Sequence, residues 1–200
     1  MRILVLGGTG RIGRLILEQG IARGHAMTAQ TRSPAPADPR DADALARLAS
    51  GRDAVIMALG TDTGGLTTLF SDSTRAVLAA MDAAGVARLV AITGVGAGET
   101  RGHGGFLYDR VIFPLFTRHR YADKDRQEAL LRDSRCDWTI LRPAPFAATP
   151  GSEPLHALTE IGPATRLSRV TPAEVPRYAL DCVEQGLHRR QAVFFGHGQA

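Results

Sequence analysis

The chain has 200 residues, of which 44% are hydrophobic and 22% charged, and its formal net charge is +4 at pH 7. This composition predicts a soluble globular protein with a single domain over residues 1–200, and it argues against a disordered chain. No run of about eighteen apolar residues occurs, which excludes a membrane-spanning helix. The scattered basic residues and an aromatic content of 6% do not suit a nucleic-acid groove.

The first residues, MRILVLGG, contain too short an apolar run for a secretory signal. The two cysteines, Cys136 and Cys182, show no metal-ligand spacing and indicate buried thiols in a reducing compartment. We therefore expect a cytoplasmic protein without a metal site, either a monomer or a homodimer.

Strand-like and helix-like patterns alternate along the chain. An apolar run at 2–6 predicts a strand covered on both faces, and helical spacing follows from 11 to about 23. A capping box, Thr171-Pro172-Ala173-Glu174, begins a late helix in which Pro176 is expected to cause a bend. Further strands are predicted at 26–31, 54–59, 87–93, 138–141, 166–170 and 192–195, and helices at 41–49, 66–84, 106–116 and 121–133. These repeated units predict an α/β Rossmann fold with a doubly wound parallel sheet.

A glycine-rich turn lies between the first strand and the first helix. The segment LVLGGTGRIG places Gly7, Gly10 and Gly13 in the turn, with Thr9 and Arg11-Ile12 between them. Glycines here allow a tight turn, a close approach to a diphosphate and a helix N-terminus aimed at its charge. The spacing G-x-x-G-x-x-G is weak evidence alone, but its place after the first strand predicts a dinucleotide site. The alternative is a tight turn without a ligand.

The end of the second predicted strand bears on which nucleotide binds. It reads Gln30-Thr31-Arg32-Ser33, without the acidic residue that commonly holds the ribose 2′-hydroxyl of NAD. An arginine and small hydroxyls suit a 2′-phosphate, and Arg11 could add to the same site. We therefore expect NADP(H) rather than NAD(H), although Arg32 could instead be a solvated loop charge.

Several segments together are similar to a known family. GGTGRIG, GRDAVIMALG, YADKDRQEALLRDSRCDWTILRP and TPAEVPRYALDCVEQG resemble atypical short-chain dehydrogenases/reductases over nearly the whole chain. The nearest resemblance is to the NmrA-like NAD(P)H-binding subgroup, which includes flavin reductases of the biliverdin reductase B type. The resemblance implies that Asp38 contacts adenine and that Ala58-Leu59-Gly60 lies along the adenosine ribose. It also implies that Thr93 takes the place of the family's serine and that Pro143-Ala144 lines the nicotinamide carboxamide. A proline-rich segment nearly erases the family's third strand, in front of Asp38.

The family's catalytic tyrosine and lysine are only partly matched. Lys124, the single lysine of the chain, fits the lysine position, but the residue four before it is Arg120. Tyr121 lies three before, about 100° away from the required helix face. The resemblance implies that Lys124 binds the cofactor ribose and that Tyr121 or Thr93 takes part in catalysis. The alternatives are a surface lysine and a packing tyrosine.

The glycine-dense segment 94–105 follows a central strand and suits a mobile lid, in which His103 could supply a proton; a disordered surface loop is the alternative. Residues 143–170 predict a small flap over the substrate and leave no room for the large substrate domain of nucleotide-sugar epimerases.

These features predict an NADPH-dependent oxidoreductase that passes hydride to a small conjugated acceptor, such as a flavin, a quinone or a similar carbonyl. Such acceptors take protons from water, so a missing catalytic tyrosine is tolerable. The alternatives are a non-catalytic NmrA-like sensor, which binds a partner protein according to the redox state of NADP(H), and a structural subunit without a ligand.

Overall fold

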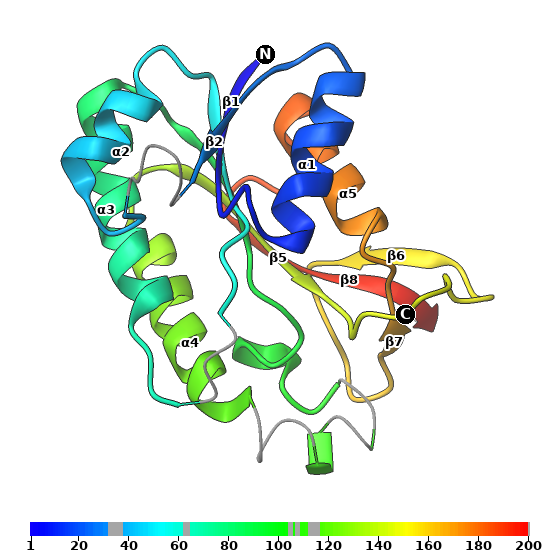
Figure 1. Ribbon diagram of the computed structural model, residues 1–200. Coiled ribbons are helices and arrows are strands. Elements are labelled where there is room, and N and C mark those ends of the chain that lie inside the picture. The colour runs from blue at the N-terminus through cyan, green and yellow to red at the C-terminus, as the bar shows by residue number, and fades with distance from the viewer. Residues whose placement is uncertain (32–37, 62–64, 104–105, 107–108, 112–116, 200) are drawn as a thin grey trace.

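A computed structural model describes residues 1–31, 38–61, 65–103, 106, 109–111 and 117–199 (Figure 1). Their strands form one sheet in the order β2-β1-β3-β4-β5-β8-β6, and β7 pairs with β8 beside this path. The strands are β1 (Arg2–Leu6), β2 (Ala26–Gln30), β3 (Ala54–Met57), β4 (Arg88–Ile92), β5 (Asp137–Pro143), β6 (Leu155–Leu158), β7 (Arg166–Arg169) and β8 (Gln191–Gln199).

The pairing confirms the predicted doubly wound sheet and adds to it. All pairs from β2 across to β8 are parallel, whereas β6 and β7 each pair with β8 in the antiparallel sense. Residues 155–158, where the sequence predicts no strand, form β6. The four-residue segment LHAL has little strand signal of its own, and it becomes a strand by pairing with β8.

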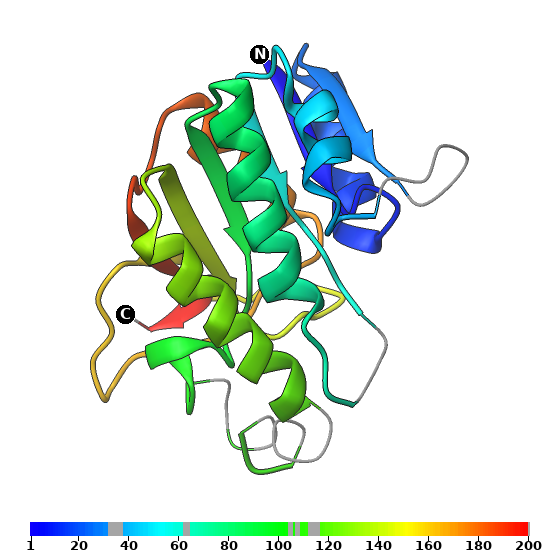
Figure 2. The ribbon, with the colours of Figure 1, turned by 90° about the vertical axis from the view of Figure 1, so that its left-hand side faces the viewer.

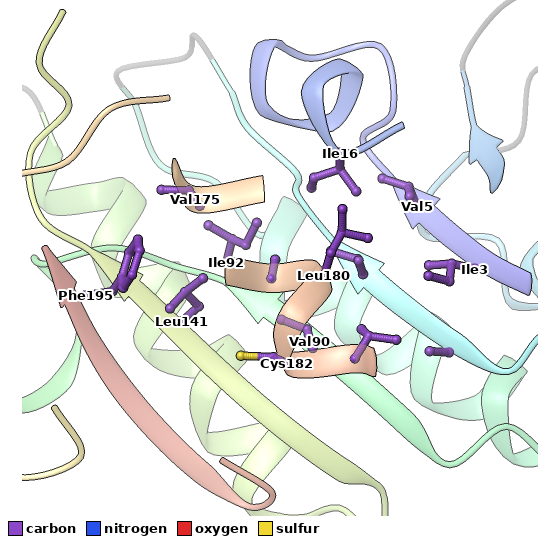
Figure 3. Close-up of a cluster of buried hydrophobic side chains, with 14 of the residues drawn as sticks. Ile3, Val5, Ile16, Val90, Ile92, Leu141, Val175, Leu180, Cys182 and Phe195 are labelled. Atoms are coloured by element: carbon purple, nitrogen blue, oxygen red, sulfur yellow. The ribbon is translucent and has the colours of Figure 1, made fainter. Parts of the chain in front are cut away.

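Helices cover both faces of the sheet (Figures 1 and 2). One face carries α1 (Arg11–Ala22) and α5 (Glu174–Glu184), and the other carries α2 (Ala42–Ala49), α3 (Leu69–Ala84) and α4 (Arg118–Asp133). Figure 3 shows the apolar core between the sheet and the first pair, where Val5, Ile92 and Leu141 meet Ile16 and Leu180. The apolar strand runs predicted from sequence are thus buried on both faces, as expected for strands of a parallel sheet that helices cover on both sides.

The ends of two helices follow their sequence signals. Asp41 precedes α2 and accepts a hydrogen bond from the Ala44 N–H at 3.0 Å. The Glu174 carboxylate accepts the Thr171 N–H at 2.7 Å, which is one of the two hydrogen bonds of a capping box, but α5 begins at Glu174 rather than directly after Thr171. Because α5 begins at Glu174, Pro176 lies in the first turn, where an N–H has no partner within the helix. The bend expected at Pro176 therefore has no cause.

The predicted flap, residues 143–170, is attached to the sheet edge rather than loose. It contains β6 and β7, and His197 of β8 holds it from the side. His197 Nδ1 lies 2.7 Å from the Glu153 carbonyl oxygen, and Nε2 lies 2.8 Å from Glu174 Oε1. Burial lowers the pKa of His197, but these two acceptors outweigh it, so the pKa is raised. Through these two contacts His197 joins the flap to the start of α5.

Further findings on membrane spans, metal ligands, thiols and the sheet edge apply to the described residues alone. No helix there is long and apolar enough to cross a membrane, and no cluster of three or more His, Cys, Asp or Glu is placed to hold a metal. Both thiols are free; Cys182 is buried in α5, while Cys136 is half-buried just before β5. The described sheet ends at β2 on one side. The proline-rich segment falls mostly in residues 32–37, outside the described residues.

Candidate functional site

The glycine turn after β1 packs main chain directly against main chain. Gly7 has a φ of +78°, and a Cβ added there would lie 2.6 Å from the Ala58 carbonyl oxygen. A Cβ on Gly13 would lie 2.1 Å from the Gly7 carbonyl oxygen. The Gly10 N–H donates to that same oxygen at 3.0 Å and closes the turn. Only glycine fits at positions 7 and 13, so the turn keeps the shape that the sequence predicted.

The start of α1 presents uncapped N–H groups. Gly10 is the residue before the helix; among the described residues no side chain caps this end, and the first turn holds no acidic residue. Thr9, Gly10 and Arg11 are exposed, and Ile12 is half-buried against the core. Unpaired N–H groups, the helix dipole and an adjacent guanidinium together suit an anion. The turn therefore fits the diphosphate of a dinucleotide.

The segment after β3 lies beside the glycine turn. Ala58-Leu59-Gly60 follows β3 directly, and its first carbonyl is the one that crowds Gly7. The chain goes from β1 to β2 on one side and places β3 on the other, so this is the switch point of the sheet. Ligands of open α/β sheets bind at such points, beyond the carboxyl ends of the strands. The structure places Ala58 against the glycine turn, and the contact of these three residues with an adenosine ribose stays a prediction.

Lys124 is buried in α4 near the end of β4, so it is not the surface lysine that remained an alternative. Its side chain is 8% exposed, its amine donates to the Thr93 carbonyl, and the amine lies 5.0 Å from the Phe70 ring centroid. Burial lowers the pKa of this amine from 10.5 to about 8; Glu128 raises it and Arg120 lowers it further. Since only β3 separates β4 from β1, the two strand ends lie about 10 Å apart, within the span of one dinucleotide.

Tyr121 and Thr93 both lie beside Lys124. The Lys124 amine is 5.8 Å from the Tyr121 ring centroid, and the Tyr121 hydroxyl oxygen would be 2.5 Å from a Cβ on Gly94. Thr93 is buried, and its hydroxyl donates to Glu128 Oε1 at 2.8 Å. In this arrangement Thr93 has no hydroxyl hydrogen left for a substrate. Lys124, Tyr121 and Thr93 therefore lie together, but the Thr93 hydroxyl points into the protein, toward Glu128.

A buried ion pair lies directly behind Thr93, on α4 and β5. The Glu128 carboxylate is held by Arg142 through Nε at 3.0 Å and Nη2 at 2.5 Å, and neither side chain is more than 2% exposed. Arg142 Nη2 also lies 2.8 Å from Glu99, which is largely exposed. A Cβ on Gly98 would lie 2.2 Å from Arg142 Nη2, so this glycine makes room for the guanidinium. Sequence analysis identified neither Glu128 nor Arg142.

The first part of the segment predicted as a lid is packed against the protein, whereas Gly98, Glu99, Arg101 and Gly102 are exposed. Its first residues, 94–97, are buried, and Val95 donates to the Pro143 carbonyl at 3.1 Å. His103 Nδ1 lies 3.1 Å from the Thr165 carbonyl, and its ring meets Phe194 edge-on. Glycine density in 94–98 thus serves close packing against Tyr121 and Arg142. Residues 104 and 105 lie outside the described residues.

Pro143 and Ala144 are placed differently from the prediction. Pro143 is the last residue of β5 rather than part of a following loop. The Ala144 N–H donates to the Phe195 carbonyl at 2.8 Å, and the Ala144 side chain is buried in the small cluster around Phe194. Because the sheet already uses this N–H, Ala144 cannot offer it to a carboxamide. The carbonyl of Pro143 keeps a second lone pair for such a contact.

The family now follows from a comparison of the whole chain. A model of the NAD(P)H-binding family matches residues 7–186, which include the glycine turn, Lys124 and the buried pair. The chain belongs to the NAD(P)H-binding family. Membership supports a nicotinamide dinucleotide as the cofactor, in agreement with the fit of the turn to a diphosphate.

Solved structures share this NAD(P)H-binding fold over nearly their full lengths. A candidate NADH-flavin reductase from Streptococcus pneumoniae is 24% identical, with a TM-score of 0.77 and coverage of 99% of this chain and 100% of that one. An anaerobilin reductase from Escherichia coli O157:H7 is 16% identical, with a TM-score of 0.75 and coverage of 100% and 98%. A candidate exported protein from Burkholderia pseudomallei is 25% identical, with a TM-score of 0.76 and coverage of 98% and 100%.

The residues proposed to contact adenosine are only partly described in this NAD(P)H-binding chain. Arg32 and Ser33, which favoured NADP(H), lie outside the described residues. Asp38 is exposed, and its carboxylate accepts the Arg40 side chain through Nε at 2.9 Å and Nη2 at 2.7 Å. The adenine contact predicted for Asp38 would have to form beside this surface ion pair.

Proposed function

We propose that this chain is an NADPH-dependent oxidoreductase that transfers hydride to a small conjugated acceptor, such as a flavin, a quinone or a similar carbonyl compound. The observation that carries the proposal is a glycine turn with an uncapped helix start at the switch point of the sheet, with a buried lysine two strands away. The fold shared with a candidate NADH-flavin reductase and an anaerobilin reductase supports the acceptor class.

The main-chain N–H groups of α1 and the side chains near them have distinct roles in this proposal. The N–H groups of α1 and Arg11 would hold the diphosphate, and Lys124 would donate to a ribose hydroxyl while bound to the Thr93 carbonyl. When bound, the nicotinamide supplies the hydride. Because Thr93 donates its hydroxyl to Glu128, the acceptor would take its proton from water or from Tyr121. Flat conjugated acceptors tolerate this, since a positioned hydride is their main requirement.

The proposed function is tested by following NADPH oxidation with FMN, FAD and several quinones. Turnover with at least one acceptor is expected. The inward Thr93 hydroxyl and the displaced Tyr121 also suit a second candidate, a non-catalytic sensor of the NADP(H) redox state. No turnover, together with different affinities for NADP⁺ and NADPH, would favour that sensor. Absence of binding to any dinucleotide would contradict both.

The preference for NADPH is tested at Arg32. Arg32→Ala should weaken binding of NADPH much more than binding of NADH, by about 1–3 kcal/mol if a charge-assisted bond to the 2′-phosphate is lost. Calorimetry with both nucleotides measures the difference. Arg47→Ala is the control, because Arg47 is an exposed arginine of α2 and should leave both affinities unchanged. Equal losses for NADPH and NADH in Arg32→Ala would refute the assignment.

We also propose that the protein acts in the cytoplasm, as a monomer or homodimer, without a nucleic-acid or membrane partner. The two free thiols agree with a reducing compartment. The likeness to a candidate exported protein makes cell fractionation the deciding measurement.

A further inference from the structure

Thr93, the residue that directly follows β4, is bound at two of its groups by residues of α4. The Thr93 carbonyl accepts the Lys124 amine, and the Thr93 hydroxyl donates to Glu128, one helical turn further along. Lys124 and Glu128 therefore share one face of α4, and both form a hydrogen bond with Thr93. Thr93, Lys124 and Glu128 are all buried.

The Glu128 carboxylate that binds Thr93 is itself held by an arginine. Arg142 of β5 holds the Glu128 carboxylate through two hydrogen bonds, so Glu128 is joined both to β5 and, through Thr93, to the residue that follows β4. Arg132 adds a longer contact to Glu128 at 3.3 Å. A bidentate arginine fixes a carboxylate in orientation as well as in position. The carboxylate can then hold the Thr93 hydroxyl, and with it the end of β4, in one place.

We propose that Glu128, held by Arg142, is a positioning residue of the cofactor site: through Thr93 and through its own charge it keeps the Lys124 amine placed and protonated for a ribose hydroxyl. This inference rests on the proposed function for the ribose contact. The contacts among the four side chains stand independently of it.

The charged groups around Lys124 give the proposal a measurable consequence. On α4 they are Glu128, Arg120 and Asp123, and the phenol ring of Tyr121 lies there as well. Asp123 accepts the Phe70 N–H at 2.8 Å and lies beside Arg126. The group that faces them from β5 is Arg142. Burial lowers the pKa of the Lys124 amine to about 8, and Glu128 opposes that fall. Neutralising Glu128 should therefore lower the pKa further and leave less of the amine charged near neutral pH.

The chain offers an unusually direct measurement, because Lys124 is its single lysine. Protein labelled at the lysine side chain and carrying a lysine-free tag gives one NMR signal, whose pH titration reports the pKa of Lys124 without any cofactor. Glu128→Gln should move this midpoint down by about one unit, the lower end of the range for loss of a nearby opposite charge. Glu99→Gln is the matched control. It removes the same charge from the other partner of Arg142, at an exposed position, and should leave the midpoint in place.

NADPH binding provides the second measurement, as a pH profile of the dissociation constant. For the unmodified protein, affinity should fall as the pH rises through about 8, and Glu128→Gln should shift that fall to lower pH. Thr93→Val keeps every charge and removes only the hydroxyl link. It should weaken binding about two- to tenfold, the factor for one net hydrogen bond, and it serves if Glu128→Gln does not fold.

The outcomes separate this inference from the proposed function. If the unmodified protein binds no dinucleotide, the proposed function fails, whereas the NMR titration still tests the electrostatic link. If NADPH binds but Glu128→Gln titrates like Glu99→Gln, the inference is overturned. It is equally overturned if Thr93→Val binds NADPH as tightly as the unmodified protein.

Discussion

Replacing Arg142 with methionine is expected to lower the free energy of unfolding by about 3–5 kcal/mol, the usual cost of leaving one buried charge without its partner. The Arg142 side chain is 2% exposed and that of Glu128 is 1% exposed. Methionine has a similar length but cannot donate to the carboxylate. Glu128 would then keep only the Thr93 hydroxyl and the more distant Arg132. Urea denaturation measures the loss as a shift of the midpoint at constant slope.

Two further variants show whether the cost comes from the stranded charge. Arg75→Met removes an exposed arginine from its pair with Asp72 on α3 and should change stability by no more than about 0.5 kcal/mol. The double variant Glu128→Met/Arg142→Met removes both charges and should recover most of the lost stability, because no ion remains buried. A single variant Arg142→Met that is as stable as Arg75→Met would show that the pair is accessible to water.

The elements that sequence predicted well are those with a strong local signal. The apolar runs became β1, β3, β4 and β5, and Gly85, with a φ of +69°, ends α3 where the pattern stops. Local signals fail where the partner is distant. The start of α3 is capped by Asp123, whose carboxylate accepts the Phe70 N–H from a helix about fifty residues later. The predicted start at residue 66 was therefore too early.

In the candidate site, too, sequence located the contiguous motif and missed the residues that only tertiary packing brings together. The glycine turn is a contiguous motif with one structural solution, and sequence located it correctly. Glu128 and Arg142 are fourteen residues apart on different elements, and only the packing of α4 on β5 brings them together. A signal was available: Arg142 stands near the end of a largely apolar strand, DWTILRP, and a buried charge needs a partner. Glu128, four residues after Lys124, was the acid on the correct helix face.

Gly13→Ala should disrupt the turn on which the cofactor proposal depends. The new methyl carbon would lie 2.1 Å from the Gly7 carbonyl oxygen and 2.8 Å from the Gly8 Cα, and both are main-chain atoms that cannot rotate away. Relief requires α1 to move off β1, which should cost roughly 1–3 kcal/mol of stability despite the better helix propensity of alanine. The same movement takes the N–H groups of α1 away from a diphosphate, so NADPH and NADH should both bind at least about tenfold more weakly.

Gly20→Ala is the matched control, because it lies on the same helix and is also buried. Its Cβ would meet the end of the Met27 side chain, with the sulfur at 2.5 Å, and that side chain can rotate to make room. Stability and nucleotide binding should therefore stay close to those of the unmodified protein. If Gly13→Ala binds both nucleotides as well as Gly20→Ala does, the main-chain amides at the start of α1 are not the diphosphate ligands. The dinucleotide would then have to bind elsewhere on the sheet edge.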